Sequence, residues 1–352
     1  MRKVICLFAV IAMTTLCSAQ ENPGKKTIIQ LPQWVQDIKL SGFGMIQYQA
    51  DDKKPDEENS FNLRLARIAL EGRITRDFYW KTQIQINGNT SSLGSSPRLV
   101  DLFGEWQHYK FFQVKAGQFK RPFTFENPMH PITQGFMSYS QNVTKLAGFS
   151  DRSGEHASNG RDIGLQIQGD FLKNRTGRYL LHYQLGVFNG EGINKKDADN
   201  RKDIIGGMWV MPVKGMRIGA FGWTGSRVID GKSMEKNRYA LSAEYVFDDW
   251  TFRSEYVHSQ GFGANREDGD KADGFYALCI APVIKNKLHV KARYDLYRNR
   301  KGWDTAKTFY EIGADYMFNK NLQLNVEYAR VNDKTRAEHN YNLVDVQLDF
   351  RF

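Results

Sequence analysis

The sequence is poor in cysteine and proline, and it has no long apolar run after its first residues. It holds 3 cysteines and 9 prolines in 352 residues. Beyond residue 20, no stretch approaches the roughly 18 consecutive apolar residues of a membrane-spanning helix. These absences exclude a bundle of membrane helices and argue against long disorder. With 31 glycines and 13% aromatic residues, the composition fits a large all-β protein.

The N-terminus predicts a secretory signal peptide over residues 1–19. Arg2 and Lys3 precede the short apolar stretch 4–12, and small residues stand just before Gln20. A positive start, an apolar core and a small-residue exit are the three parts of such a leader. An N-terminal anchor helix is the alternative, but this apolar core is short for one.

Cysteine usage indicates the compartment. A lipoprotein anchor at Cys17 is disfavoured because Leu16 is bulky for the usual processing site. Removing the leader leaves Cys279 alone, so no internal disulfide can form. An exported chain of this size without disulfides points to a bacterial envelope.

Ten-residue stretches with period-two alternation recur along the chain and predict strands with one wet and one dry face. In 288–297, leucine, valine, alanine and tyrosine share one face, and charged residues share the other. The alternation is poor around 61–66 and 216–224, where a bulge or a misplaced boundary would explain it. Sixteen strands are expected, at 38–49, 63–74, 79–88, 99–108, 112–119, 162–170, 179–189, 203–212, 216–225, 238–247, 251–259, 274–282, 288–297, 307–318, 322–330 and 341–352.

The position of the aromatic residues separates a membrane barrel from a soluble β-sandwich. Rings crowd the tight turns, as in 78–80, 109–112 and 247–252. Aromatic girdles of this kind flank the apolar band of an outer-membrane barrel, whereas a sandwich would hold its rings in mid-strand. The pattern therefore predicts a sixteen-stranded antiparallel transmembrane β-barrel in the bacterial outer membrane.

The C-terminal strand supports a closed barrel. Apolar residues occupy every second position from Val344 to the terminal Phe352, although chain ends in soluble proteins tend to fray into water. Closure is required in lipid because an open edge would leave backbone groups without partners. The terminal pattern also resembles the signal read by the barrel assembly machinery. The expected division is signal peptide 1–19, a short periplasmic segment 20–37 and a barrel over 38–352.

A barrel of this size should enclose water, and one long connection should set its narrowest point. About forty residues separate Phe119 from Asp162, and loops of that length are usually functional. We expect this third loop to fold into the lumen; an extracellular lid is the alternative. The wall charges, eight basic against eleven acidic, could instead form ion pairs that brace the barrel. The candidate pore and constriction residues are Lys115, Lys120, Arg121, Lys145, Arg152, Arg161, Arg67, Arg73, Lys81, Arg253 and Arg293.

Excess positive charge gathers in the long connections. Without the leader, 47 basic residues face 39 acidic ones, a net charge of +8. A basic mouth would concentrate anions at low salt. Attraction to lipopolysaccharide phosphates would use the same residues, and the sequence leaves both interpretations open. These residues are Lys195, Lys196, Arg201, Lys202, Arg227, Lys232, Lys236, Arg298, Arg300, Lys301, Lys334 and Arg336.

Five short motifs resemble one family of channels. The run 114–123 (VKAGQFKRPF) is similar to the signature of phosphate-selective porins O and P. Four further stretches follow the same family in order: 64–72 (RLARIALEG), 160–169 (GRDIGLQIQG), 186–190 (GVFNG) and 253–256 (RSEY). The resemblance spans nearly all of the mature chain.

The resemblance implies a sixteen-stranded homotrimeric porin whose third loop folds inward and through which anions or phosphate pass. Only Lys115, Lys120 and Arg121 carry over with the shared motif. Family members specialised for phosphate have many basic residues along the pore, and this chain has no strong basic bias there.

The sequence favours passive transport of small hydrophilic solutes over catalysis. It contains no G-x-S-x-G, H-E-x-x-H or phosphate-loop motif, and its 7 histidines lack metal-ligand spacing. No cofactor, metal or nucleic acid is expected. The alternative is a barrel that only anchors an adhesin or an enzyme, which would need a catalytic constellation or a large external domain.

Overall fold

The computed structural model describes residues 36–55, 57–87, 97–149, 159–229, 231–261 and 271–352. The expected signal peptide, nearly all of the expected periplasmic segment and the candidate Arg152 lie outside this part. Within the described residues, no helix is long and apolar enough to cross a membrane.

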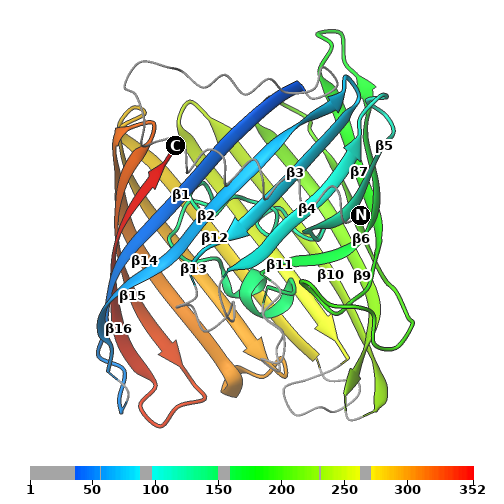
Figure 1. The fold of residues 1–352 in the computed structure, drawn as a ribbon. Coiled ribbons are helices and arrows are strands. Elements are labelled where there is room, and N and C mark those ends of the chain that lie inside the picture. The colour runs from blue at the N-terminus through cyan, green and yellow to red at the C-terminus, as the bar shows by residue number, and fades with distance from the viewer. Residues whose placement is uncertain (1–35, 56, 88–96, 150–158, 230, 262–270) are drawn as a thin grey trace, which may run out of the picture. The chain divides into compact units, whose positions relative to one another are not determined.

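Sixteen antiparallel strands follow one another in chain order and close into a barrel, with β16 paired to β1 (Figure 1). The predicted fold and strand number are confirmed. The strands are β1 (Gln36–Asp51), β2 (Asn59–Thr75), β3 (Phe78–Gln85), β4 (Arg98–Trp106), β5 (Gln113–Lys120), β6 (Arg161–Lys173), β7 (Tyr179–Phe188), β8 (Asp203–Val210), β9 (Met216–Ile229), β10 (Lys232–Phe247), β11 (Trp250–Gln260), β12 (Lys271–Ile284), β13 (Leu288–Asn299), β14 (Ala306–Asn319), β15 (Leu322–Asp333) and β16 (Asn340–Arg351).

Several strands run further than the alternation predicts, mainly at the end away from the tight turns. The β9–β10 ladder continues until Ile229 pairs with Lys232, whereas the expected strands stop at 225 and start at 238. The regular alternation thus ends before the backbone pairing does.

Alternate residues face lipid and lumen as expected over the later strands. On β14, Ile312 is 60% exposed and its neighbour Glu311 is 8% exposed. On β15, Val326 is 44% exposed and Glu327 is 5% exposed. The apolar side chains therefore cover the outside of the barrel, and the acidic ones point inward.

The two places with poor alternation have different causes. Met45 pairs with Leu65 and Ile46 with Leu63, so Arg64 is an extra residue in a bulge of β2, as expected. No register shift occurs in β9. There, Phe221 and Trp223 point inward and are buried, so the inner face of β9 is itself apolar.

The barrel closes through contacts of the last residue. Gly42 and Phe352 exchange two backbone hydrogen bonds of 3.0 and 3.1 Å. A side chain on Gly44 would place its Cβ 2.3 Å from Cζ of Phe350. The glycine therefore lets the penultimate aromatic ring lie flat over β1 at the seam.

Aromatic side chains gather at the tight-turn end, as predicted. The rings of Trp250 and Phe252 stack with centroids 5.8 Å apart, and those of Tyr316 and Phe318 lie 5.0 Å apart. Phe247, Phe252 and Phe318 are exposed on the outside, where interfacial lipid would contact them.

Candidate pore and constriction

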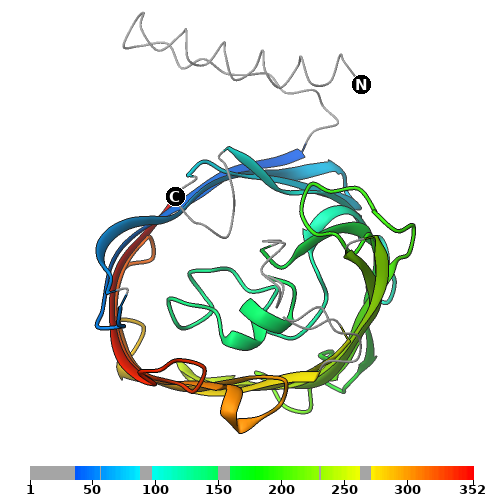
Figure 2. The same cartoon turned by 90° about the horizontal axis from the view of Figure 1, so that it is seen from below.

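The connection between β5 and β6, hereafter loop 3, comprises residues 121–160. Figure 2 looks along the barrel and places the described part of this connection inside the ring of strands. The described part of loop 3 contains a π-helical turn, η2 (Asn142–Leu146), which contacts β11 and β12.

Three inward-facing carboxylates hold the backbone of loop 3 against the wall. Glu255 of β11 accepts from the N–H groups of Phe125 and Glu126 at 2.8 and 2.9 Å. Glu327 of β15 accepts from Met137 N at 2.8 Å. Asp295 of β13 likewise accepts from the backbone N–H of Gln141 at 2.8 Å. Such charge-assisted bonds contribute about 1.5–3 kcal/mol each.

Three inward-facing cations hold the carbonyl groups of the same loop. Arg253 donates to Gln134 O, Lys291 to Gly135 O at 3.0 Å, and Arg293 to Ser138 O at 2.9 Å. The cations are also paired within the wall, Arg253 with Glu244, Lys291 with Glu327, and Arg293 with Glu311. Arg253 and Arg293, both expected in the pore, are thus buried beneath the loop.

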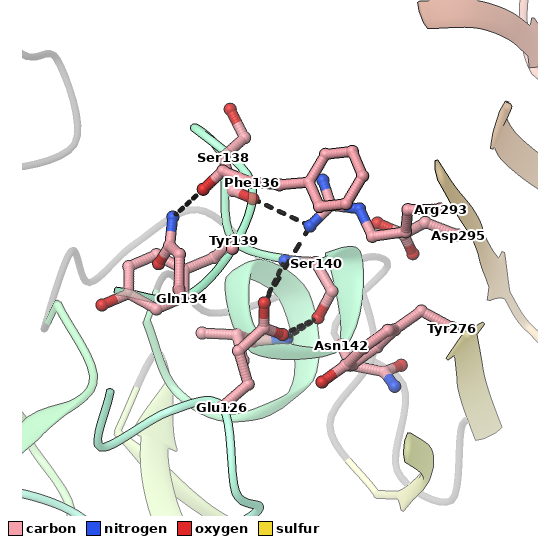
Figure 3. A network of polar contacts seen from close by, with 12 residues as sticks. Glu126, Gln134, Phe136, Ser138, Tyr139, Ser140, Asn142, Tyr276, Arg293 and Asp295 are labelled. Atoms are coloured by element: carbon pink, nitrogen blue, oxygen red, sulfur yellow. Dashed lines mark hydrogen bonds and ion pairs between the residues drawn. The ribbon is translucent and has the colours of Figure 1, made fainter. Parts of the chain in front are cut away.

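Glu126 lies at the centre of this buried network. Its carboxylate accepts from the backbone and hydroxyl of Ser140, and it lies 4.0 Å from the Arg293 guanidinium (Figure 3). Glu126 is fully buried. The negative charge of Glu126, a loop residue, therefore lies close to the positive charge of Arg293 on β13.

A second buried pair fixes the two ends of loop 3. Arg121 donates to Asp162 Oδ2 at 2.8 Å and to Gly148 O at 2.9 Å. Asp162 also accepts from Gly190 N at 3.0 Å. Arg121 and Asp162 are 3% and 0% exposed, so this pair belongs to the scaffold of the constriction.

An apolar cluster fills the space between loop 3 and the strands behind it. Phe123 and Phe125 of the loop lie edge-on to Trp223 and Phe221 of β9, with centroids 5.5 and 5.4 Å apart. All four are nearly fully buried. Part of the lumen is therefore a dry core.

Three of the candidate cations form a cluster at the root of loop 3. Electrostatic interactions link Lys120 with Arg67, Arg161 and Asp101. Arg161 forms an ion pair with Asp101 at 2.6 Å. Lys120 donates to backbone carbonyls of the loop. Lys120 also interacts with Glu126, so three cations and two carboxylates of the described residues meet at this level of the lumen.

Three further candidates lie near the tight-turn end. Lys115 pairs with Glu105, and Lys81 with Glu71, each at 3.4 Å. Arg73 donates to the Gln107 side chain at 3.0 Å. These contacts match the alternative of wall-bracing pairs, and they are separate from the cluster at the loop root.

Lys145, in η2, is exposed to the lumen. Desolvation lowers the pKa of Lys145, nearby Lys307 lowers it further, and Asp333 opposes both. Lys307 is missing from the sequence-based candidates. It shares the inward parity of Glu311 on β14, and this parity was the signal that could have identified it.

One residue of the expected basic mouth lies elsewhere. Lys236 is 2% exposed, pairs with Asp203 at 3.0 Å and donates to Gly190 O. It braces the wall behind loop 3, so assigning it to the mouth was wrong. Its position inside β10, not in a loop, is the reason.

A closed sixteen-stranded antiparallel barrel with a polar inner wall and a connection packed in its lumen is the architecture of an outer-membrane porin. Comparison with family models identifies the family. The chain belongs to the phosphate-selective porins O and P, whose family model matches residues 42–352. The resemblance found in the sequence motifs is confirmed.

Solved structures share the fold at low sequence identity. An anion-selective porin from Comamonas acidovorans has a TM-score of 0.69 at 14% identity, over 90% of this chain and 100% of that chain. OmpF of Salmonella typhi in complex with daunomycin has 0.67 at 14%, over 92% and 100%. The outer membrane channel DcaP of Acinetobacter baumannii has 0.63 at 11%, over 92% and 99%. No curated protein sequence matches the chain significantly.

Proposed function

We propose that this porin is a passive channel for small hydrophilic solutes across the bacterial outer membrane, with a preference for small anions that includes inorganic phosphate. The barrel gives a polar path through lipid, and loop 3 narrows that path. Catalysis plays no part in this proposal, because diffusion through a lumen needs only a path and a charge pattern.

The observation that carries the anion preference is the cluster at the loop root. Arg67, Lys120 and Arg161 gather around Asp101, and Lys120 also interacts with Glu126. Arg67 and Arg161 are nearly buried, so their charges act through a low-dielectric wall and are weakly screened by salt. A positive potential at the root of loop 3 raises the local concentration of anions. The anion-selective porin of Comamonas acidovorans, with the same fold, supports this reading.

The cellular location, the folding pathway and the oligomeric state are part of the same proposal. An exported chain with a cleaved leader would reach the outer membrane and be folded there by the barrel assembly machinery. A homotrimer is supported by the family resemblance and by an OmpT structure described as a trimer form. Exposed mouth lysines and arginines would contact lipopolysaccharide phosphates or steer anions inward.

The test is the reversal potential of purified protein in planar bilayers under a potassium chloride gradient. The native channel should give a reversal potential of anion sign. Arg67→Gln should shift it toward zero, because one cation leaves the cluster. Arg76→Gln removes a cation from the neighbouring tight turn and should leave it unchanged. A reversal potential of cation sign, or no conductance from correctly folded protein, would overturn the proposal.

A further inference from the structure

A cavity of about 580 Å³, hereafter the outer groove, opens on the outer wall of the barrel across β12 to β15. Its floor consists of small side chains, Ala277 and Cys279 of β12 and Ala292 of β13. Cys279 pairs directly with Ala292 across the two strands, so two small side chains stand next to each other. The wall is therefore hollowed at a place where it faces lipid.

Larger lipid-facing side chains form the rim of the outer groove. Tyr310 and Ile312 of β14 are 54% and 60% exposed, and Tyr328 of β15 is 40% exposed. Tyr294 of β13 lies on the side away from the tight turns, with its ring centroid 5.5 Å from that of Tyr310. This rim is apolar and aromatic, so a hydrocarbon chain can fill the groove, whereas an ion would find no polar partner on these side chains.

One charged residue lies at the edge of this apolar lining. Arg330 of β15 lines the groove and pairs directly with Tyr310 across the two strands. Its guanidinium donates to Asn342 Oδ1 at 2.9 Å, which is its one side-chain hydrogen bond within the described residues. A guanidinium has five N–H donors, so most of them remain available to a ligand.

Arg330 lies at the level of the lipid head groups. The tight turns of an outer-membrane barrel face the periplasm, so the opposite ends of the strands meet the outer leaflet. Tyr294, Tyr310 and Arg330 form one row, since each pairs with the next across neighbouring strands. Tyrosine rings favour the boundary between hydrocarbon and head groups. An anionic head group would therefore meet Arg330 when its acyl chain enters the groove.

The Arg330 side chain is held in place by its neighbours. Asn342 Oδ1 accepts from Arg330 and also from Tyr328 Oη, at 2.9 and 2.7 Å. Asp52 interacts electrostatically with Arg330, but both of its carboxylate oxygens accept from Asn342. A guanidinium that is already positioned loses little freedom on binding, and its planar fork matches phosphate oxygens.

We propose that the outer groove binds lipopolysaccharide, the phosphorylated acyl lipid of the outer leaflet. One acyl chain lies over Ala277, Cys279 and Ala292, and a phosphate of the head group accepts from Arg330. Every membrane lipid brings hydrocarbon, so the charge-assisted contact at Arg330 decides which lipid is retained. The site rests on the outer-membrane location in the proposed function and names the wall where that lipid binds.

The first measurement identifies the lipid. Native porin and Arg330→Gln are extracted from outer membranes in a mild non-ionic detergent, and native mass spectrometry identifies the lipids that remain bound to each. Lipopolysaccharide should accompany the native barrel and be largely lost from the variant. A phospholipid as the species lost from Arg330→Gln would overturn the assignment.

The second measurement compares two lipids that differ in one group. Delipidated porin is titrated with lipid A that carries one phosphate and with the same lipid A after enzymatic removal of that phosphate. The phosphorylated lipid should bind roughly tenfold more tightly to the first site filled, because only this lipid forms the charge-assisted contact.

Variants separate the head-group contact from the groove. Arg330→Gln should remove the tenfold difference, whereas Ala292→Phe should weaken both lipids alike, because its ring fills the floor. The matched controls are Arg76→Gln, in a tight turn, and Ala116→Phe, at an exposed position of β5; both should leave lipid binding unchanged. Cys279→Phe is the second groove variant, should Ala292→Phe fail to give a compact band on an unheated gel.

Each outcome of the titration decides the proposal. Equal affinity of the two lipids for the native barrel overturns it, and so does a difference that survives Arg330→Gln. Undiminished binding to the folded groove variants shows that the acyl chain lies elsewhere and also overturns it. The reversal potential of the same preparations tests the proposed anion preference separately, so failure of lipid binding leaves that preference standing.

Discussion

At the scale of single residues, Arg121 of the motif 114–123 stabilises the fold of loop 3 and does not line the aqueous path. Arg121 lies under loop 3, donates to Asp162 and Gly148, and lies 5.0 Å from the Trp223 ring centre. Two charges buried this fully are stable only while both are present. The motif therefore fixes where the loop leaves and re-enters the wall.

The buried pair of Arg121 and Asp162 predicts a large loss of stability when the charge of Asp162 is removed and its shape is kept. Asp162→Asn should destabilise the folded barrel by about 3–5 kcal/mol, because the buried Arg121 loses the carboxylate to which it donates. The temperature at which the compact band on a gel converts to the unfolded band measures this. The control is Asp197→Asn, which breaks the pair with exposed Lys202 and should cost at most about 1 kcal/mol. Similar shifts for the two variants would contradict the buried-pair argument.

At the scale of elements, loop 3 is held by groups from alternate strands, β11, β13 and β15. Each strand offers a carboxylate to loop N–H groups, and cations from β11 and β13 reach loop carbonyls. A segment with little regular structure of its own thus satisfies its backbone through the wall. The apolar contacts with β9 hold the same segment from the other side.

Removing one carboxylate should loosen this element without opening the barrel. Glu255→Ala leaves the N–H groups of Phe125 and Glu126 buried without an acceptor, which costs about 1–3 kcal/mol for each. We expect faster tryptic cleavage within loop 3 and a larger, noisier single-channel conductance. Glu255→Gln keeps an acceptor oxygen in place and should stay close to the native channel. An unchanged Glu255→Ala channel would show that the other contacts hold the loop without Glu255.

At the scale of the whole molecule, closure depends on a seam between the first and last strands. Nine residue pairs join β1 to β16, from Phe43 with Arg351 to Asp51 with Leu343. Phe352 adds two backbone hydrogen bonds to Gly42 beyond that ladder. In lipid, each unpaired backbone group at this seam is costly because no water replaces the lost partner.

Deleting Phe352 should therefore lower the yield of closed barrel. Two backbone hydrogen bonds and one lipid-facing ring are lost together at the seam. The measurement is the fraction of protein that runs as the compact, heat-convertible form after refolding into detergent. Phe318→Ala removes another exposed ring from the tight-turn end, away from the seam, and should refold nearly as well. Equal yields for the two would show that closure does not depend on the last residue.

The later strands and the site differ in how far the sequence could predict them. On β13 to β15, one face meets lipid and the other carries most of the charge, so alternation identifies inward residues such as Lys291, Glu311 and Glu327. On β9, the inner face meets the aromatic side chains of loop 3, and the same rule fails at Phe221 and Trp223. The candidate cations of the wall were predicted by parity, but parity does not distinguish a pore-facing arginine from one bound to the loop.

The sequence by itself determined the barrel, because lipid outside and water inside impose a period of two on every strand, and a closed sheet leaves no edge in lipid. It also determined that a forty-residue connection interrupts this regularity. Only the tertiary structure decided what that connection does with the charges. Arg253 and Arg293 donate to backbone carbonyls of loop 3, Arg67 and Lys120 gather near Asp101, and Lys145 of the loop lies near Lys307 of β14. These pairings join residues far apart in the chain, and no local pattern encodes which charge faces which.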